Sequence, residues 1–131
     1  MPEMLIAAKD GAAIVMTRGA VRELARSLGF DTVDQTRLAT AVSEIVRNVV
    51  LYAEGGHVVF SVADSAAGQG IEVIIQDDGP GIDDVHRVLA GGYSTSGGFG
   101  RGIAGASALV DEFRLSSSPG SGTRVVMRKW P

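Results

Sequence analysis

The chain is 131 residues long, and its 45% of hydrophobic and 21% of charged residues are typical of one soluble globular domain, which we expect to span residues 1–131. Its formal net charge of −3 and its pI of about 5.3 argue against nucleic acid or an acidic membrane as the main partner, and the absence of cysteine excludes disulfides, thiol catalysis and thiolate metal sites. No apolar run approaches the roughly 20 residues of a membrane span, and the N-terminus lacks an export signal, so the sequence predicts a cytoplasmic protein.

The N-terminal part predicts a short strand followed by a helix. The strand is "MLIAA", residues 4–8, and Asp10 is a candidate N-cap for a helix over about 12–28 that ends at Gly29. The predicted apolar stripe of this helix comprises Ile14, Val21, Leu24, Ala25 and Leu28. A hairpin at Asp10-Gly11 leading into a strand "AAIVM" is the alternative, and the helix is favoured.

A second helix is the clearest predicted element. Thr32 and Gln35 have the spacing of a capping box, and Gly55-Gly56 ends the helix. Apolar residues follow the cap at helical spacing, namely Leu38, Ala41, Val42, Ile45, Val49 and Tyr52.

The remaining sequence predicts strands and helices separated by glycine-rich segments. They are strands over 57–64 and 70–77 with a loop at 65–70, a helix over 83–90, a loop over 91–102, a helix over 103–113, a strand over 113–118, a turn at 119–122 and a strand over 123–130. The order β-α-α-β-β-α-α-β-β predicts an α/β sandwich, with one mixed sheet and helices stacked on one of its faces.

Two aspartates, Asp77 and Asp78, stand at the C-terminal end of the predicted strand in "IEVIIQDDGPGI". Side chains alternate between the faces of a strand, so Asp77 shares a face with the apolar residues Val73 and Ile75. Asp78 falls with Glu72 on the more polar face. We therefore predict that Asp77 points at the buried layer, where a carboxylate is costly unless it is hydrogen-bonded.

Further residues make a pocket more plausible than a plain acidic turn, which is the alternative for "DDGPG" alone. Gly79 and Gly81 would let the backbone approach a flat ligand closely. Glu44 and Asn48 are four residues apart and share one face of the second helix, on the shoulder of its apolar stripe. With an inward Asp77 they outline a polar pocket between helix and sheet.

A glycine-rich segment, "GGFGRG" at residues 97–102, stands directly before a predicted helix. Backbone N–H groups at such a place can bind phosphate, although flexible loops have the same composition. It is not a Walker loop, because no Gly-Lys-Ser/Thr follows, and it is not a dinucleotide fingerprint, because no strand precedes it.

Taken in order, "SEIVRN", "DDGPGI", "GGFGRG" and "GSGT" resemble the four ATP-binding boxes of the gyrase, heat-shock chaperone, histidine kinase and mismatch-repair (GHKL) superfamily. The resemblance runs nearly end to end. "GFDTVDQTRLATAVSEIVRNVVLYA" and "GGYSTSGGFGRGIAG" look especially like the small bacterial serine/threonine switch kinases of the stressosome pathway. The resemblance implies the Bergerat ATP-binding fold, an α/β sandwich.

The resemblance also implies site roles. Asn48 would bind a Mg²⁺ that bridges the phosphates, Glu44 would be the general base, and Asp77 would accept the adenine amino group. Gly79 and Gly81 would shape the adenine pocket. Thr123 would hold adenine through its hydroxyl, and its parity with Val125 and Met127 points it inward, with an ordinary strand threonine as the alternative. The implied phosphate lid comprises Gly98, Gly100 and Gly102.

The function implied by the resemblance is an ATP/ADP- and Mg²⁺-dependent protein kinase. Its substrate would be a serine on a STAS-domain protein of a stressosome-like complex, and a PP2C-type phosphatase would be its other partner, with no nucleic acid and no membrane involved. Rivals are an anti-sigma factor kinase, a non-enzymatic ATP-gated binding module and a detached histidine kinase ATPase domain. Monomer and dimer both stay open. His57 and His86 are interpreted as incidental. Arg47 and Arg101, near the proposed phosphates, are interpreted as solvated side chains, with stabilisation of the transition state as the alternative.

Overall fold

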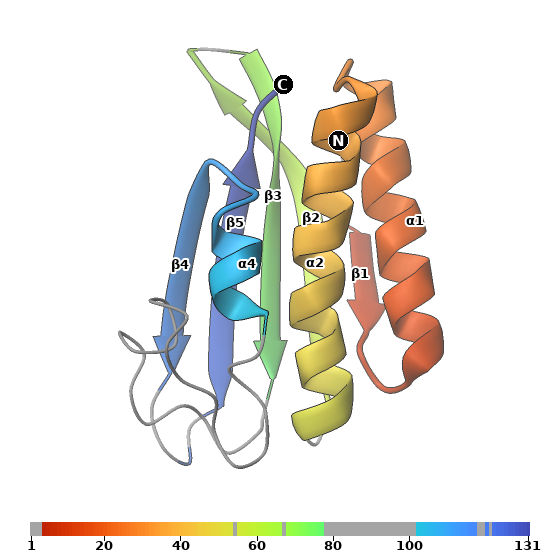
Figure 1. The fold of residues 1–131 in the computed structure, drawn as a ribbon, viewed down its shortest axis with the longest axis vertical. Coiled ribbons are helices and arrows are strands. Elements are labelled where there is room, and N and C mark those ends of the chain that lie inside the picture. Colours follow the sequence, from red (N-terminus) through yellow and green to blue (C-terminus); the bar gives the residue numbers. More distant parts are fainter. Residues whose placement is uncertain (1–3, 54, 67, 78–101, 118–119, 121) are drawn as a thin grey trace.

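A computed structural model of the chain describes residues 4–53, 55–66, 68–77, 102–117, 120 and 122–131. Its framework is a five-stranded sheet with helices on one face (Figure 1). The strand order is β1-β2-β3-β5-β4. The strands are β1 (Met4–Ala7), β2 (Gly56–Ser65), β3 (Gly68–Asp77), β4 (Glu112–Ser117) and β5 (Thr123–Lys129).

The predicted sandwich is confirmed, but the sheet is not mixed, because every described strand pair is antiparallel. The reason lies partly in the first crossover. Two helices, rather than one, connect β1 to β2, so the chain reverses three times and the two strands run in opposite directions. The β2–β3 connection is also tighter than the predicted loop, since β2 runs to Ser65 and β3 starts at Gly68.

Helix α1 (Gly11–Ser27) confirms the helical interpretation over the hairpin. The side chain of Asp10 accepts from the backbone N–H groups of Ala12 and Ala13, at 3.1 and 3.4 Å. Gly29 follows the helix with a φ of +86°, a left-handed conformation that suits glycine. The cap and the terminal glycine therefore fix both ends of α1 as the sequence predicts.

Helix α2 (Thr32–Tyr52) begins one residue earlier than predicted, so the capping box is wrong. Asp31 is the N-cap, and its Oδ1 accepts from the N–H of Asp34 at 2.7 Å. The side-chain amide of Gln35 instead donates to the carbonyl of Phe30 at 2.8 Å. A carboxylate is as good a cap as a hydroxyl, and Asp31 is placed to satisfy the first turn.

The hydrophobic core lies between α2 and the sheet. Burial of each large apolar side chain contributes about 1.5–3 kcal/mol. Side chains that are at most 2% exposed include Leu38, Val42, Val46, Val49, Val58, Phe60, Ile71, Ile75, Ile103 and Met127. The apolar alternation that predicted β3 is thus the face that packs on the helices.

Helix α4 (Ile103–Ser107) is shorter than the predicted helix over 103–113. The chain leaves the helix to join the sheet: Asp111 N–H donates to the carbonyl of Arg128, and Phe113 pairs with Met127 on β5. From Glu112 onward the backbone therefore pairs with β5 instead of continuing the helix. The predicted helix over 83–90 and the loop from 91 to 101 lie outside the described residues.

The three described helices α1, α2 and α4 lie side by side on one face of the sheet (Figure 1). α2 contacts both of the others. No helix among the described residues is long and apolar enough to cross a membrane. The other face of the sheet has no described helix against it.

Candidate functional site

Four elements converge at one end of the sheet. The C-terminal half of α2, the last residue of β3, the first residue of β5 and the start of α4 all lie at the lower end of Figure 1. Three polar side chains are buried there: Asp77 is 3%, Thr123 4% and Asn48 5% exposed. Buried polar side chains must be hydrogen-bonded or compensated by a ligand, so this cluster is the strongest candidate for a functional site.

Asp77 faces the helices, which confirms its predicted direction. It pairs with Thr123 across β3 and β5, and the backbone N–H of Thr123 donates to Asp77 Oδ1 at 3.2 Å. On its other side it pairs with Gly56. A Cβ at Gly56 would stand 2.3 Å from the carbonyl oxygen of Gln76 and 3.0 Å from the Cα of Asp77, so only glycine fits beside this carboxylate.

Thr123 also faces inward as predicted, and a second hydroxyl accompanies it. Ser117 Oγ lies 2.9 Å from Thr123 Oγ1, and it donates to the carbonyl of Gly122 at 2.9 Å. Ser117 was not singled out from the sequence. The sequence does indicate this pair, because a hairpin around the "PGSG" turn places residue 117 opposite residue 123.

A small cavity joins these polar groups to apolar walls. Its volume is about 10 Å³, close to the least that holds one water molecule, so the residues that line it do not enclose a whole ligand. It is lined by Ile45, Asn48, Val49, Ile75, Asp77, Ile103, Thr123 and Val125. Apolar walls with a few convergent polar groups are typical of a small-molecule site.

Glu44 stands one turn before Asn48 on α2 and packs against the start of α4. A Cβ built on Gly102 would lie 2.5 Å from Glu44 Oε2. Gly102 has a φ of +82° and is the residue that precedes α4. The Glu44 carboxylate is half-buried, whereas Asn48 is more deeply buried than its predicted position on the shoulder of the stripe suggests.

The donor set fits a nucleotide with a magnesium ion. Asn48 offers an amide oxygen and Glu44 a carboxylate on one helix face, and oxygen ligands suit Mg²⁺. Among the described residues, no group of three or more His, Cys, Asp or Glu could hold a metal by itself. A cation here would therefore take most of its ligands from phosphates and water, as Mg²⁺ does when it binds with a nucleotide.

The structure brings together five of the predicted site residues: Glu44, Asn48, Asp77, Gly102 and Thr123. The others lie outside the described residues, namely Gly79, Gly81, Gly98 and Gly100, as do Asp78, His86 and Arg101. Arg47 and His57 are exposed.

Comparison with known proteins relates this arrangement to a family. Residues 33–131 match the family of histidine kinase-, DNA gyrase B- and HSP90-like ATPases. The serine/threonine-protein kinase RsbT of Bacillus subtilis is 44% identical over 89% of this chain and 88% of its own length. An anti-sigma F factor of Clostridium novyi is 30% identical over 72% of this chain and 69% of its own length.

The fold has relatives among solved structures. A structure of the RsbU and RsbW domains of a Mycobacterium tuberculosis protein superposes with a TM-score of 0.65 and 23% identity. The match covers 98% of this chain and 32% of that one. A histidine kinase domain of Erythrobacter litoralis superposes with a TM-score of 0.54 and 17% identity, over 91% of this chain and 59% of that one.

Proposed function

The chain belongs to the family of histidine kinase-, DNA gyrase B- and HSP90-like ATPases, and we propose that it is an ATP-dependent protein serine/threonine kinase that works by partner switching. The kinase class rests on the 44% identity to a serine/threonine-protein kinase over 89% of the chain. The structural observation that carries the proposal is the cluster of buried Asp77, Asn48 and Thr123 around one cavity.

In this proposal the small cavity is the inner end of a larger site, and adenine binds against it. Asp77 accepts a hydrogen bond from the adenine amino group, while the hydroxyl of Thr123 contributes a second polar contact. The Thr123 N–H bond to Asp77 supports this role, because it holds the carboxylate in one orientation. Gly79 and Gly81, which follow β3 in the sequence, shape the same pocket in this proposal.

The phosphates extend from adenine toward Asn48, Glu44 and Gly102. Asn48 supplies an amide oxygen to a Mg²⁺ that neutralises phosphate charge when bound. Gly98, Gly100 and Gly102 contribute backbone contacts to the phosphates. The close packing of Gly102 on Glu44 supports this arrangement, since it places a predicted phosphate-binding residue beside the predicted base.

Glu44 acts as the general base in the transfer. A bond forms between the serine hydroxyl oxygen of the substrate and the γ-phosphorus, the bond from that phosphorus to ADP breaks, and the hydroxyl proton passes to the Glu44 carboxylate. Its half-buried position at the edge of the site, away from the adenine cavity, is consistent with contact to a protein substrate.

The substrate we propose is a serine on a STAS-domain protein of a stressosome-like complex, and the second partner is a PP2C-type phosphatase that the released kinase activates. Overlapping surfaces for the two partners would make their binding exclusive. A phosphate on the first partner would then disrupt its contact by charge and desolvation.

A second candidate is an anti-sigma factor kinase, which the 30% identity to an anti-sigma F factor favours. One experiment separates the candidates: incubation with labelled ATP and Mg²⁺ together with candidate STAS-domain proteins and sigma factors. Label on a STAS-domain serine with activation of a phosphatase supports the proposal. A stable sigma factor complex supports the second candidate, and ATP-dependent binding without transfer supports a non-catalytic module.

A further inference from the structure

The face of the sheet opposite the helices carries an apolar row that crosses four strands. Leu5 pairs with Val59, Val59 with Ile74, and Ile74 with Val126, so the four side chains lie on one line across β1, β2, β3 and β5. Leu5 is 67% exposed, and the other three are half-buried. Strands lie about 4.8 Å apart, so the row spans roughly 14 Å.

An antiparallel sheet can expose one face to water, and such a face normally presents polar side chains. The two rows that flank the apolar row on this face follow that rule. One runs through His57, Gln76, Arg124 and Ser116, and the other through Ser61, Glu72, Arg128 and Glu112. The aliphatic row between them departs from the rule, and an apolar strip rimmed by polar residues is typical of a binding surface.

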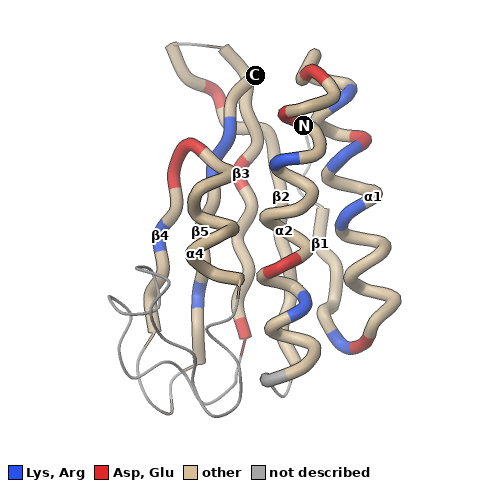
Figure 2. The backbone as a smooth tube through the Cα atoms, viewed as in Figure 1, with Lys and Arg blue, Asp and Glu red and all other residues tan. Residues whose placement is uncertain are grey.

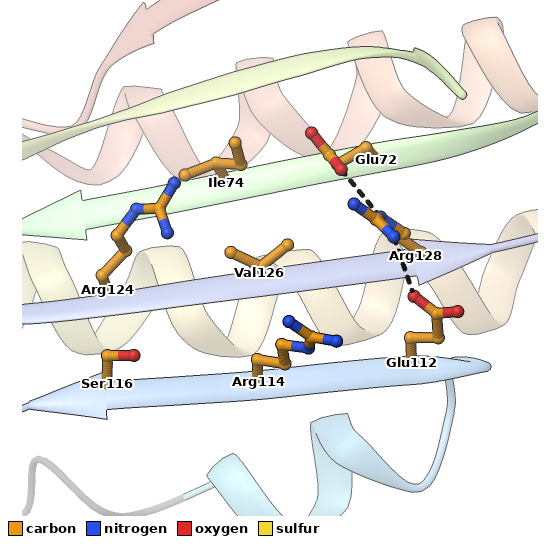
Figure 3. A pocket seen from close by; sticks show the side chains of 8 residues that line it. All are labelled: Glu72, Ile74, Glu112, Arg114, Ser116, Arg124, Val126 and Arg128. Carbon is orange, nitrogen blue, oxygen red and sulfur yellow. Dashed lines mark hydrogen bonds and ion pairs between the residues drawn. The ribbon is translucent and has the colours of Figure 1, made fainter. Parts of the chain in front are cut away.

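The positive charge on this face is concentrated at one end of the row. Arg114 pairs with Val126 and thus stands on the row itself, and Arg124 is its neighbour on β5 (Figure 3). Figure 2 shows that the Lys and Arg residues of the sheet lie on β4 and β5, while β1 is uncharged. The row therefore has an apolar end at Leu5 and a cationic end at Arg114.

The third arginine is already neutralised. Arg128 donates to Glu72 at 2.7 Å and to Glu112 at 3.2 Å, both drawn in Figure 3. The hydrogen bond and charge of Glu72, with a smaller contribution from Glu112, raise the pKa of Arg128 above its ordinary value. Arg114 and Arg124, in contrast, have no ion-pair partner among the described residues. The groove of about 320 Å³ between these side chains thus has a net charge of +1 from three arginines and two glutamates, and two of its arginines lack an ion-pair partner among the described residues.

We propose that this face docks a protein partner through an amphipathic segment, whose apolar side chains cover Leu5, Val59, Ile74 and Val126 and whose carboxylates pair with Arg114 and Arg124. The charge pattern selects this occupant, because only an anionic group compensates the two free arginines while aliphatic side chains cover the rest. A nucleic acid would leave the aliphatic row uncovered. The surface lies on the opposite face of the sheet from Asp77 and Thr123, so a partner bound here would leave the proposed nucleotide site open.

The test uses two labelled synthetic peptides of equal length with the same apolar residues, one ending in glutamates and the other in lysines. Fluorescence anisotropy measures binding, and methyl NMR of the full chain locates it. We expect the glutamate peptide to bind and to shift the methyl signals of Leu5, Val59, Ile74 and Val126. The double variant Arg114→Glu/Arg124→Glu should bind it at least about tenfold more weakly and should prefer the lysine peptide.

Arg22→Glu/Arg26→Glu, an equal charge change at two exposed positions of α1, is the control and should bind like the wild type. Nucleotide binding by the double variant should also match the wild type. The proposal is overturned if the two peptides bind the wild type equally, or if neither binds. It is also overturned if sedimentation shows a dimer that the double variant dissociates, because the occupant would then be a second copy of the chain.

Discussion

Asp77 and Thr123 face each other across β3 and β5, and the backbone N–H of Thr123 donates to Asp77 Oδ1 over 3.2 Å. This bond holds a carboxylate that is only 3% exposed at the inner end of the cavity between α2 and the sheet. The two residues are 46 positions apart in sequence. Their contact thus ties the end of the central strand to the start of its neighbour at the point where we propose that adenine binds.

Asp77→Asn should abolish the preference for ATP over GTP. An amide can still accept the Thr123 N–H, so the fold should survive, but the group that faces the base changes from acceptor only to acceptor and donor. A site built to bond one base discriminates because the wrong base leaves a buried polar group unpaired. Competition binding with the two nucleotides measures the preference. Asp78→Asn is the matched control and should keep the preference for ATP. If both variants lose that preference equally, Asp77 is not the residue that selects adenine.

Asn48→Ala should weaken Mg²⁺-dependent ATP binding by about 1–3 kcal/mol, the range of a hydrogen bond to a charged group. The loss should shrink when Mg²⁺ is removed with a chelator, because the proposed contact is to the cation. Calorimetry with and without Mg²⁺ measures both values. Gln76→Ala is the control: it removes an exposed amide on the other face of β3 and should change the ATP affinity neither with Mg²⁺ nor without it. Unchanged Mg·ATP affinity in Asn48→Ala would remove Asn48 from the site.

Gly102→Ala should destabilise the protein and slow phosphoryl transfer. Its φ of +82° costs a residue with a Cβ about 1–2 kcal/mol, and the Cβ would stand 2.5 Å from Glu44 Oε2. Urea unfolding measures the first effect and a kinase assay the second. Gly105→Ala, inside α4, is the control, since a Cβ there meets nothing within 4 Å and alanine favours helix. If both variants are equally stable, Gly102 is not constrained as the structure indicates.

Much of this fold could be predicted because local patterns agree with the packing. The alternation of Ile71, Val73 and Ile75 gave the buried face of β3 and hence the direction of Asp77, and Asp10 and Gly29 marked the ends of α1. What failed depends on long-range pairing. The predicted helix over 103–113 ends at Ser107, because the backbone of Asp111 donates to Arg128 and Glu112 pairs with Arg128 on β5, and no pattern within that segment indicates this partner.

The part of the candidate site that depends on spacing within one element could also be predicted from the sequence. Asn48 and Glu44 share a helix face by spacing alone, whereas the contact between Glu44 and Gly102 requires knowing that α4 packs on α2. The sequence predicts Gly56 only as part of a helix stop, and its close approach to Asp77 follows from the β2–β3 register. Spacing within an element is encoded locally, but distances between elements follow from the whole fold.

Asp34→Ala should destabilise the protein more than Lys129→Met does. The Lys129 side chain is only 7% exposed, and its Nζ lies 3.4 Å from Asp34 Oδ1. Removing the aspartate leaves a buried ammonium without its partner, which costs about 3–5 kcal/mol, whereas methionine replaces lysine with an apolar side chain of similar length. Arg37→Met, which breaks the exposed pair with Asp34, should cost less than about 1 kcal/mol. Urea denaturation measures the loss of unfolding free energy in all three variants. A larger loss in Lys129→Met than in Asp34→Ala would contradict the buried ion pair.

Glu44→Gln should separate catalysis from binding. Glu44 lies one helical turn before Asn48 and is not among the residues that line the cavity, so it can reach the terminal phosphate without touching adenine. A general base contributes roughly 10²–10⁴-fold to rate but little to ground-state affinity. The variant should therefore bind ATP and hold its STAS-domain partner normally, while phosphorylating it hundreds of times more slowly.

Such a variant should trap the complex of kinase and substrate, and the phosphatase partner should stay inactive in its presence. Glutamine keeps the shape of glutamate, so the packing against Gly102 survives and a slower transfer reports the lost base and not a displaced α4. Single-turnover measurement of transfer from labelled ATP, with nucleotide affinity measured in parallel, distinguishes the two quantities. Transfer at the normal rate in Glu44→Gln would show that another group takes the serine proton. Equal losses of affinity and rate would instead place Glu44 in nucleotide binding, because a base acts only on the step in which the hydroxyl proton leaves.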